Sequence, residues 1–308
     1  MRARARARAS GAAIVLAMLL AALAAAVAAT VFADQQRWSR TAEHRRDQVQ
    51  AQALAIAGVQ WGRQILYDDA QRSAIDHLGE PWAVALPPIP LDNGEVRGAI
   101  ADAQARLNVN ALGATGANAD VEGARLARLF AQRGGPAGTL AAIADWIDRD
   151  AIVRNGGAED AAYGGRPRGG VAANAPLLRV AELGEVKGVT APALAAVAPF
   201  LSALPVGTPV NVNTAPPEVL AAVVDKLDGD ALARLVASRA QKPFTTVAEF
   251  RARLPGPASV VAEDTLAVKS DYFYVTIEAR QGLTVARARA LLHRRSGAWP
   301  DVVWQVVE

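Results

Sequence analysis

The run ASGAAIVLAMLLAALAAAVAATVFA at 9–33 carries no charged side chain, and Arg2, Arg4, Arg6 and Arg8 stand directly before it. As a helix the run would be roughly 37 Å long at about 1.5 Å per residue. That length exceeds the roughly 30 Å hydrocarbon core of a bilayer. Because clustered arginines stay on the cytoplasmic side, we predict a single-pass membrane helix with the rest of the chain on the other side.

Three interpretations of this amino terminus compete. A cleaved secretory signal has an apolar core of about 7–15 residues followed by a small-x-small site; the run here is longer, although Ala-x-Ala occurs within it. A plain single-pass anchor is the second interpretation. The third takes into account that the helical pattern continues past the apolar run, with no proline before Pro81.

The pattern beyond residue 33 predicts that one helix extends over 12–78. Apolar residues recur at helical spacing among arginine, aspartate and glutamine, namely Leu54, Ala57, Trp61 and Ile65. This part is amphipathic and suited to lie against a sheet. Gly58 and Gly62 are four residues apart, and tight packing within the domain is the favoured explanation for them.

Alternating apolar and polar residues predict an antiparallel sheet near the carboxyl terminus. In DYFYVTIEAR at 271–280, every second residue from Phe273 is apolar. Gln281-Gly282 and Ser296-Gly297 supply turns before a return strand and a last strand, VVWQVV at 302–307. Residues 94–112 are expected to form a further strand or hairpin of the same body.

These patterns favour an α+β fold, with a long amino-terminal helix packed on an antiparallel sheet and a large all-α domain inserted into the body. We expect a leader at 1–11, a membrane-spanning part at 12–33, and the rest of the helix with the first strands at 34–114. The inserted domain, with its helical hairpins, is expected at 115–265 and the last strands at 266–308.

Composition excludes several classes of function. The chain has no cysteine, which rules out disulfides and thiolate chemistry. Beyond the four leading arginines, 29 lysines and arginines are balanced by 30 aspartates and glutamates, so a general nucleic-acid surface is not expected. The histidines, His44, His77 and His293, lack metal-ligand spacing, and His44 and His77 are expected on the long helix. With no catalytic motif present, we expect that the protein is not an enzyme.

The acidic stretch DWIDRDAIVRNGGAED at 145–160 is a candidate metal site. Ca²⁺ takes six to eight oxygen ligands, several of them carboxylates. A Gly-Gly turn could return Glu159 and Asp160 to Asp148 and Asp150, which are the expected ligands. Two structural alternatives remain: Asp145 could be a solvated helix residue, and Glu159 could cap the following segment.

The segments 177–205 and 210–250 resemble helix-hairpin-helix units, of which PVNVNTAPPEVL at 209–220 begins the second. Such hairpins bind DNA phosphate through backbone N–H groups and a nearby cation. Here the first unit offers only Lys187, and the second places Asp228 and Asp230 where a phosphate would lie. A scaffold role is favoured, with Thr214 as the expected N-cap of the first helix.

A basic leader, Gly11 and a charge-free helix that becomes amphipathic resemble the class III signal of type IV pilins and type II secretion pseudopilins. The resemblance implies cleavage between Gly11 and Ala12 by a prepilin peptidase and methylation of Ala12. Most members have a glutamate as the fifth mature residue, whereas this chain has Leu16 there. The absence of this glutamate is typical of the K-type minor pseudopilins. The chain also resembles them in the motifs LNVNAL, DWIDRD, GGAED, AANAPL and PVNVNTAP, which occur in this order.

The K-type resemblance implies an inner-membrane subunit with its globular part in the periplasm, at the tip of the type II secretion pseudopilus. There it would help initiate assembly and protein export across the outer membrane. Implied partners are the I-type and J-type minor pseudopilins, other pseudopilins, the assembly platform and prepilin peptidase. The family also has calcium sites in its helical domain, although Ala151, Ile152 and Ala161 replace acids often found there. The alternative is a membrane-anchored helix-hairpin-helix DNA-binding protein of the competence type.

Overall fold

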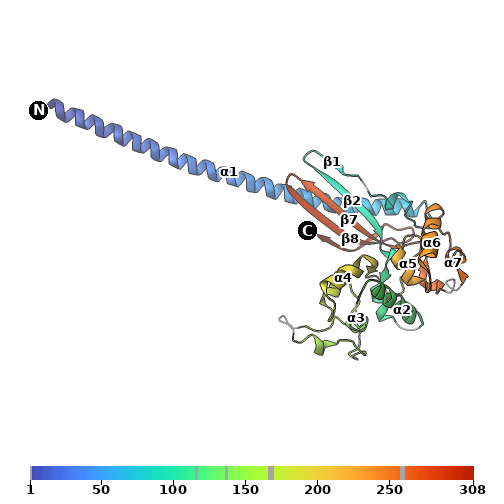
Figure 1. Ribbon diagram of the computed structural model, residues 1–308. Helices are drawn as coiled ribbons and strands as arrows, with labels where there is room; N and C mark the ends of the chain where they lie inside the picture. The colour runs from blue at the N-terminus through green and yellow to red at the C-terminus, as the bar shows by residue number, and fades with distance from the viewer. Residues whose placement is uncertain (1, 86, 115–116, 136–137, 166–169, 257–260) are drawn as a thin grey trace.

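The computed structural model describes the chain except residues 1, 86, 115–116, 136–137, 166–169 and 257–260. Helix α1 (Arg2–Ala70) is continuous, and its amino-terminal part projects away from the rest of the molecule (Figure 1). The helix ends at Ala70 rather than at the expected Leu78. Beyond it the backbone N–H of Asp76 donates to Val268 O (2.9 Å), so this segment pairs with a distant part of the chain instead of continuing the helix.

The sheet has five antiparallel strands, which confirms the predicted α+β class. Its strands, in spatial order, are β1 (Ile89–Leu91), β2 (Gly94–Asp102), β7 (Tyr272–Gln281), β8 (Thr284–His293) and β9 (Asp301–Val307). The last three form the expected meander. On β7 the alternation is strict, because Phe273, Val275 and Ile277 are buried on one face.

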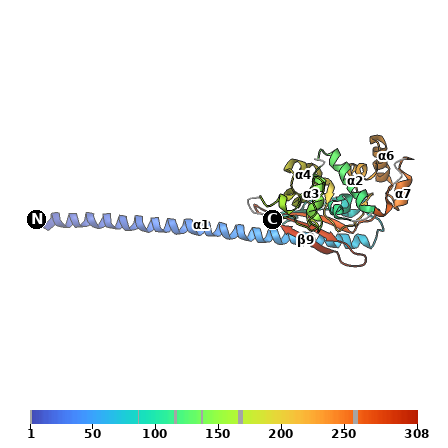
Figure 2. The same ribbon diagram turned by 90° about the horizontal axis from the view of Figure 1, so that it is seen from below.

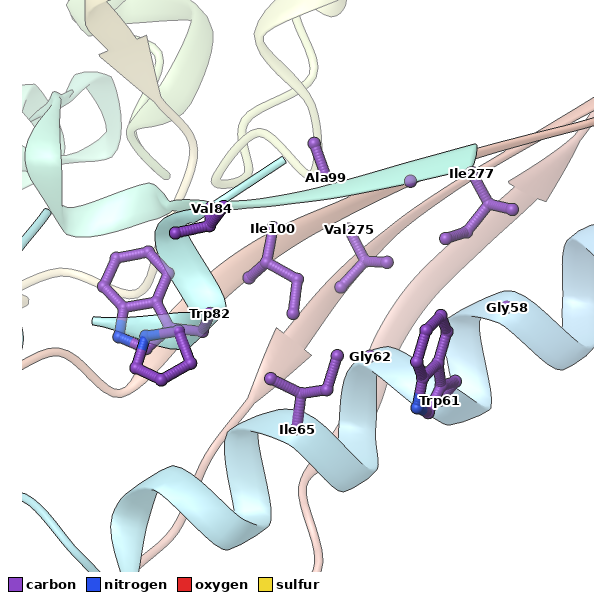
Figure 3. Close-up of a pocket in the computed structure, with 12 residues that line it drawn as sticks. Gly58, Trp61, Gly62, Ile65, Trp82, Val84, Ala99, Ile100, Val275 and Ile277 are labelled. Atoms are coloured by element: carbon purple, nitrogen blue, oxygen red, sulfur yellow. The ribbon is translucent and has the colours of Figure 1, made fainter. Parts of the chain in front are cut away.

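Helix α1 covers that face, and two glycines bring it close. Ala51, Ala55 and Val59 pack in one core with the apolar residues of β7 and β8. A Cβ added at Gly58 would lie 2.7 Å from Ile277 Cγ2, and one at Gly62 would lie 3.1 Å from Val275 Cγ1. Figure 3 shows both glycines facing β7 across a crevice of only about 20 Å³, room for about one water. The two glycines therefore serve packing within the body.

Between β2 and β7 the chain forms a second, mainly helical region with its own core. Its α-helices are α2 (Ala117–Gln132), α3 (Thr139–Ile147), α4 (Ala191–Val197), α5 (Pro217–Val223), α6 (Gly229–Gln241) and α7 (Val247–Ala252). The 3₁₀ turns among the described residues are η1 (Pro81–Ala83), η2 (Ala103–Ala105), η3 (Val109–Gly113), η4 (Asp160–Ala162), η5 (Val180–Glu185), η6 (Ala198–Phe200) and η8 (Glu263–Thr265). Two edge-to-face aromatic pairs, Trp146 with Tyr163 and Phe244 with Phe250, lie in this core.

Each of two short parallel strand pairs has one strand within the region expected to be all-α and its partner just outside that region. β3 (Leu107–Asn108) pairs with β4 (Leu201–Ser202), and β5 (Val210–Asn211) pairs with β6 (Leu266–Ala267). β6 falls in the stretch assigned to the last strands of the body, yet it pairs with β5 instead of joining the five-stranded sheet. The expected boundary at residue 115 lies outside the described residues.

The helical region lies on the sheet's other face. Ala103 and Leu204 pack there against Leu291, Tyr274 and Trp304. Figure 2 shows α2, α3 and α4 on one side of the sheet and α1 along the other. The molecule thus has three layers: the long helix, the sheet, and the helical region.

Candidate functional site

The amino-terminal part of α1 is long and apolar enough to cross a membrane. It is exposed along its whole length from Ala12 to Phe32, and none of its most apolar stretch is buried. Leu16, at the position of the family's usual glutamate, is 59% exposed. Gly11 and Ala12 lie within α1 where the apolar run begins, and cleavage between them stays a prediction.

Three of the four predicted metal ligands converge at the end of α3. Asp148 follows the helix directly, and one carboxylate oxygen each of Asp148, Asp150 and Glu159 lies within 4.8 Å of the others. Asp160 lies apart from this group of three, because its Oδ1 accepts a hydrogen bond from Ala172 N (2.8 Å) and the residue is exposed. This bond ties Asp160 to Ala172.

Glu159 is the unusual member of this acidic cluster. The residue is only 5% exposed, and neither of its carboxylate oxygens has a hydrogen-bond partner among the described residues. Burial, and then the neighbouring aspartates, among them Asp145, Asp148 and Asp150, raise the pKa of Glu159 above its ordinary value of 4.5. Oδ1 of Asp148 is likewise buried and unpaired within the described part of the chain.

Asp145 and Arg154 complete the surroundings of the cluster. Asp145 is fully buried rather than solvated, and it accepts from Arg154 Nη1 (2.9 Å) and Arg154 N (3.2 Å). The same guanidinium donates to Asp148. A Cβ at Gly157 would lie 1.9 Å from Asp145 Oδ2, so the Gly-Gly turn is needed for this close approach. Sequence reasoning missed Arg154, although it stands between the two acidic groups.

The donor set of the cluster fits a hard divalent cation. Only oxygen donors converge, three of them are buried without a partner, and Arg154 alone offsets the surrounding carboxylates within the described residues. Ca²⁺ accepts irregular sets of carboxylates, carbonyls and waters. Asp148, Asp150 and Glu159 are the side chains that would hold it. Glu159 does not cap the turn η4 with its side chain.

A second group of acids, at the end of α1, already has its cation. Arg294 donates to Asp69 Oδ2 (2.8 Å), to both oxygens of Asp76 (2.6 Å each) and to Ser270 O (2.7 Å). Glu80 accepts from the indole N–H of Trp82 (2.9 Å). Burial raises the pKa of Asp69 to about 6 and that of Asp76 above its ordinary value. This cluster ties the end of the helix to the sheet and needs no metal.

The histidines do not form a metal site in the described residues. His44 lies on α1, as expected, with Nδ1 3.4 Å from Thr284 Oγ1. His77 lies beyond the end of α1, not on it, because the helix stops at Ala70. His293 is stacked on Tyr272 with ring centroids 4.5 Å apart. The three histidines thus lie in different parts of the fold and do not share a site.

The hairpin of α5 and α6 uses its helix ends internally. Asp228 is the N-cap of α6 and accepts from Ala231 N (2.7 Å), so a carboxylate occupies the place of a phosphate. The expectation that Thr214 is the N-cap of α5 is wrong, because Pro216 holds that position. The Thr214 hydroxyl instead donates to Asp102 Oδ2 (2.5 Å). Arg239 is buried and donates to Val212 O and Ala215 O (2.8 and 2.7 Å). These contacts indicate a scaffold.

The two Asn-Val-Asn repeats form matching junctions at the base of the helical region. Asn110 accepts from Leu177 N (2.8 Å) and donates to Leu204 O (3.0 Å). Asn213 accepts from Phe244 N (2.8 Å) and donates to Phe244 O (2.9 Å). In each repeat a buried amide side chain pairs with the backbone of a segment far away in the sequence, which fixes that segment without a strand ladder.

Known proteins resemble the chain over most of its length. Family models described as type II secretion system (T2SS), protein K match residues 105–206 and 210–269. The type II secretion system protein K of Aeromonas hydrophila is 33% identical over 239 residues, covering 71% of this chain and 72% of the relative. That of Pseudomonas aeruginosa is 32% identical over 245 residues, covering 76% of this chain and 73% of the relative.

A solved structure shares the fold. A chain in the crystal structure of the GspK-GspI-GspJ complex from the enterotoxigenic Escherichia coli type 2 secretion system superposes with a TM-score of 0.76 at 25% identity. The match covers 88% of this chain and 99% of that one. With its long exposed helix, its antiparallel sheet and its inserted helical region, the chain belongs to the type II secretion system protein K family.

Proposed function

We propose that the chain is a non-catalytic minor pseudopilin that assembles with I-type and J-type minor pseudopilins at the tip of the type II secretion pseudopilus. The single observation that carries this is the likeness, over 88% of this chain, to a subunit of the GspK-GspI-GspJ complex. The architecture of the body suits such an assembly. The exposed apolar part of α1 would pack with the corresponding helices of other subunits, and the sheet lies at the other end of the helix. The subunit helps initiate the fibre and thereby protein export.

Co-purification tests the assembly. The full chain, co-expressed with the I-type and J-type pseudopilins of its own host and extracted in detergent, is expected to hold both through size-exclusion chromatography. A major pseudopilin in place of both partners is the matched control and should elute separately. Failure to hold either minor partner would refute the tip assignment.

Processing at Gly11 is part of the same proposal. Prepilin peptidase removes 1–11 on the cytoplasmic side, and Ala12 becomes the methylated amino terminus, with the globular part in the periplasm. The apolar run that begins at Ala12 supports this, because it is fully exposed and ready for a bilayer or for other helices. Mass spectrometry should find Ala12 first in the wild type and Met1 retained in Gly11→Val. The control Ala13→Val should be processed; an intact Met1 in the wild type would exclude this route.

We also propose a structural Ca²⁺ at Asp148, Asp150 and Glu159. The unpaired buried oxygens of Glu159 and Asp148 support it. A ligand at a hundredfold excess over its Kd stabilises a protein by about 2.7 kcal/mol. Ca²⁺ should therefore raise the melting temperature of the full chain. Glu159→Gln should abolish the rise, and Asp225→Asn, at an exposed site, should keep it. An equal rise in Glu159→Gln, or no calorimetric heat in the wild type, would remove the site.

The DNA-binding alternative finds no support. Asp228 occupies the start of α6, and Asp230 lies in its first turn. Both would repel a phosphate, so the hairpins belong to the scaffold of the helical region.

A further inference from the structure

A large cleft lies between the second face of the sheet and the helical region, with a volume of about 630 Å³. Its floor is formed by Tyr274 and Thr276 of β7, Arg289 of β8, and Trp304 and Val306 of β9. Its wall is formed by Arg179 and Val180 at the start of η5, Leu194 of α4 and Ala198 of η6. In Figure 1, α4 lies below the labels of β7 and β8. Nothing in the proposed function uses the cleft.

The cleft carries guanidinium groups that lack carboxylate partners. Arg106 lies over the ring of Tyr274, with its Cζ 5.1 Å from the ring centroid, and makes no hydrogen bond or ion pair to a described residue. Arg289 is exposed on the floor and also lacks such a partner in the described part. Arg179 has one loose contact, 3.7 Å from Nε to Glu182 Oε1. Of the lining side chains only Glu308 is acidic.

Among the arginines on the described strands of the sheet, Arg289 differs from the others in having no acidic partner. Elsewhere on the same sheet the arginines are paired across strands: Arg97 and Arg287 both contact Glu278, and Arg280 lies 3.9 Å from Glu95. The register places Arg289 opposite Thr276 on β7 and Val306 on β9, which cannot neutralise it. The positive charge of Arg289 in the cleft is therefore not neutralised by its neighbours in the sheet.

The size and lining of the cleft define the ligand. Pockets of about 300–1,000 Å³ with apolar walls and a few polar groups suit organic ligands, and an inorganic anion would fill only a small part of this one. Guanidinium forks bind carboxylates bidentately, while Leu194 and Val306 offer apolar surface in the same cleft. A nucleic acid is disfavoured, because the chain after the leading arginines has 29 basic against 30 acidic residues.

We propose that the cleft binds an extended acidic peptide segment of another polypeptide. Its carboxylates pair with Arg106 and Arg289, and its apolar side chains lie against Leu194 and Val306. Such a segment would be held by the subunit's sheet and helical region together. The proposal is independent of the tip assignment and of the calcium site, so its failure would leave both intact.

A direct binding measurement tests the proposal. The probe is a fluorescein-labelled peptide of alternating glutamate and valine, added to the full chain in detergent and followed by fluorescence anisotropy. Matched peptides carry glutamine or lysine in place of glutamate. The glutamate peptide is expected to bind at least tenfold more tightly than the glutamine peptide, and added salt should weaken it. No binding, or equal binding of the glutamine peptide, would overturn the proposal.

Variants locate the binding. Arg106→Gln with Arg289→Gln should weaken the glutamate peptide by about tenfold or more, since hydrogen bonds to charged groups contribute about that factor each. Arg72→Gln with Arg234→Gln removes two exposed arginines outside the cleft and should leave binding unchanged. Unchanged affinity in the cleft variant would place the peptide elsewhere and refute the site.

Charge reversal guards against a trivial loss of folding. Arg289 is exposed, so Arg289→Glu should keep the melting temperature, lose the glutamate peptide and gain preference for the lysine peptide. A variant that binds neither peptide while still folded would count against the geometry. Phosphate and single-stranded DNA are tested as competitors of the glutamate peptide, on the wild type and on the same variants. If either competed as well as the peptide at equal concentration, it would replace the peptide as ligand and overturn the proposal.

Discussion

At the scale of single residues, the most consequential group is a carboxylate with no cation beside it. Asp102 is buried, and its Oδ2 accepts from Thr214 Oγ1 (2.5 Å), Ser270 Oγ (2.6 Å) and Asn211 Nδ2 (3.1 Å). Burial raises its pKa from 3.8 to about 6, although these hydrogen bonds oppose the shift. Relative to the unfolded state, the folded state therefore binds the proton of this residue more tightly.

A pH dependence of stability follows. Because the folded state binds the proton more tightly, the contribution of Asp102 is largest below pH 3.8 and is lost as pH rises to about 6. The shift corresponds to about 3 kcal/mol. Asp102→Asn imitates the neutral form, so the wild type should lose about that much relative to the variant between about pH 4 and about pH 7. Urea unfolding of both proteins measures it. Asp225→Asn is the control, and a constant difference between wild type and Asp102→Asn would contradict the assignment.

Residue-scale features differed in how far sequence could predict them. Asp148, Asp150 and Glu159 were found because they are close in sequence and bear the right donors. The pairing of Arg294 with Asp76 was not, because 218 residues separate the two and no local pattern records the contact. Asp160 stays a predicted ligand that lies apart from the other three, and its hydrogen bond from the backbone N–H of Ala172 could not be read from composition.

At the scale of elements, the packing of α1 on β7 depends on missing side chains. A methyl group at Gly58 would lie 2.7 Å from Ile277 Cγ2 and 3.0 Å from Cγ1. Gly58→Ala should therefore destabilise the protein by about 1–3 kcal/mol, against a gain of about 1 kcal/mol in helix propensity.

The control for this substitution lies on α2. A Cβ at Gly123 would meet nothing within 4 Å, so Gly123→Ala should stabilise the protein by up to about 1 kcal/mol. Urea unfolding compares the two variants. If both moved the free energy of unfolding in the same direction, the close approach at Gly58 would not be the cause.

Elements followed local patterns where those patterns were long. The meander of β7, β8 and β9 was predicted from alternation, and the helical body of α1 from periodicity. The predicted end of α1 at Leu78 was wrong, because the helix stops at Ala70 and Asp76 pairs with the distant Val268 instead. The strands β3 to β6 have two residues each, too few to give a period, and the asparagine side chains that bond the backbone next to β4 and β6 come from distant parts of the sequence.

At the scale of the whole molecule, the projecting part of α1 contributes little to the free energy of unfolding of the folded body. Every residue from 12 to 46 is exposed, whereas Ala51, Ala55 and Val59 are fully buried. A fragment that starts at Asp34 should therefore unfold within about 0.5 kcal/mol of the full chain. Urea unfolding in the same detergent tests this.

The matched control removes the packed part of the helix. A fragment that starts at Gln60 loses three core residues, which together contribute several kcal/mol, and should be much less stable or unfolded. Equal stability of the two fragments would show that the packed segment of α1 does not support the sheet.

The position of the helical region has a topological consequence. β2 and β7 are neighbours in the sheet, with Asp102 opposite Phe273, and Ser270 Oγ donates to Asp102 Oδ2. The whole region is therefore the loop of a β-hairpin. Because closure entropy grows only logarithmically with loop length, an ancestral hairpin could expand into a domain at little thermodynamic cost. Lineages can thus enlarge, shrink or exchange this domain while the underlying sheet keeps its register.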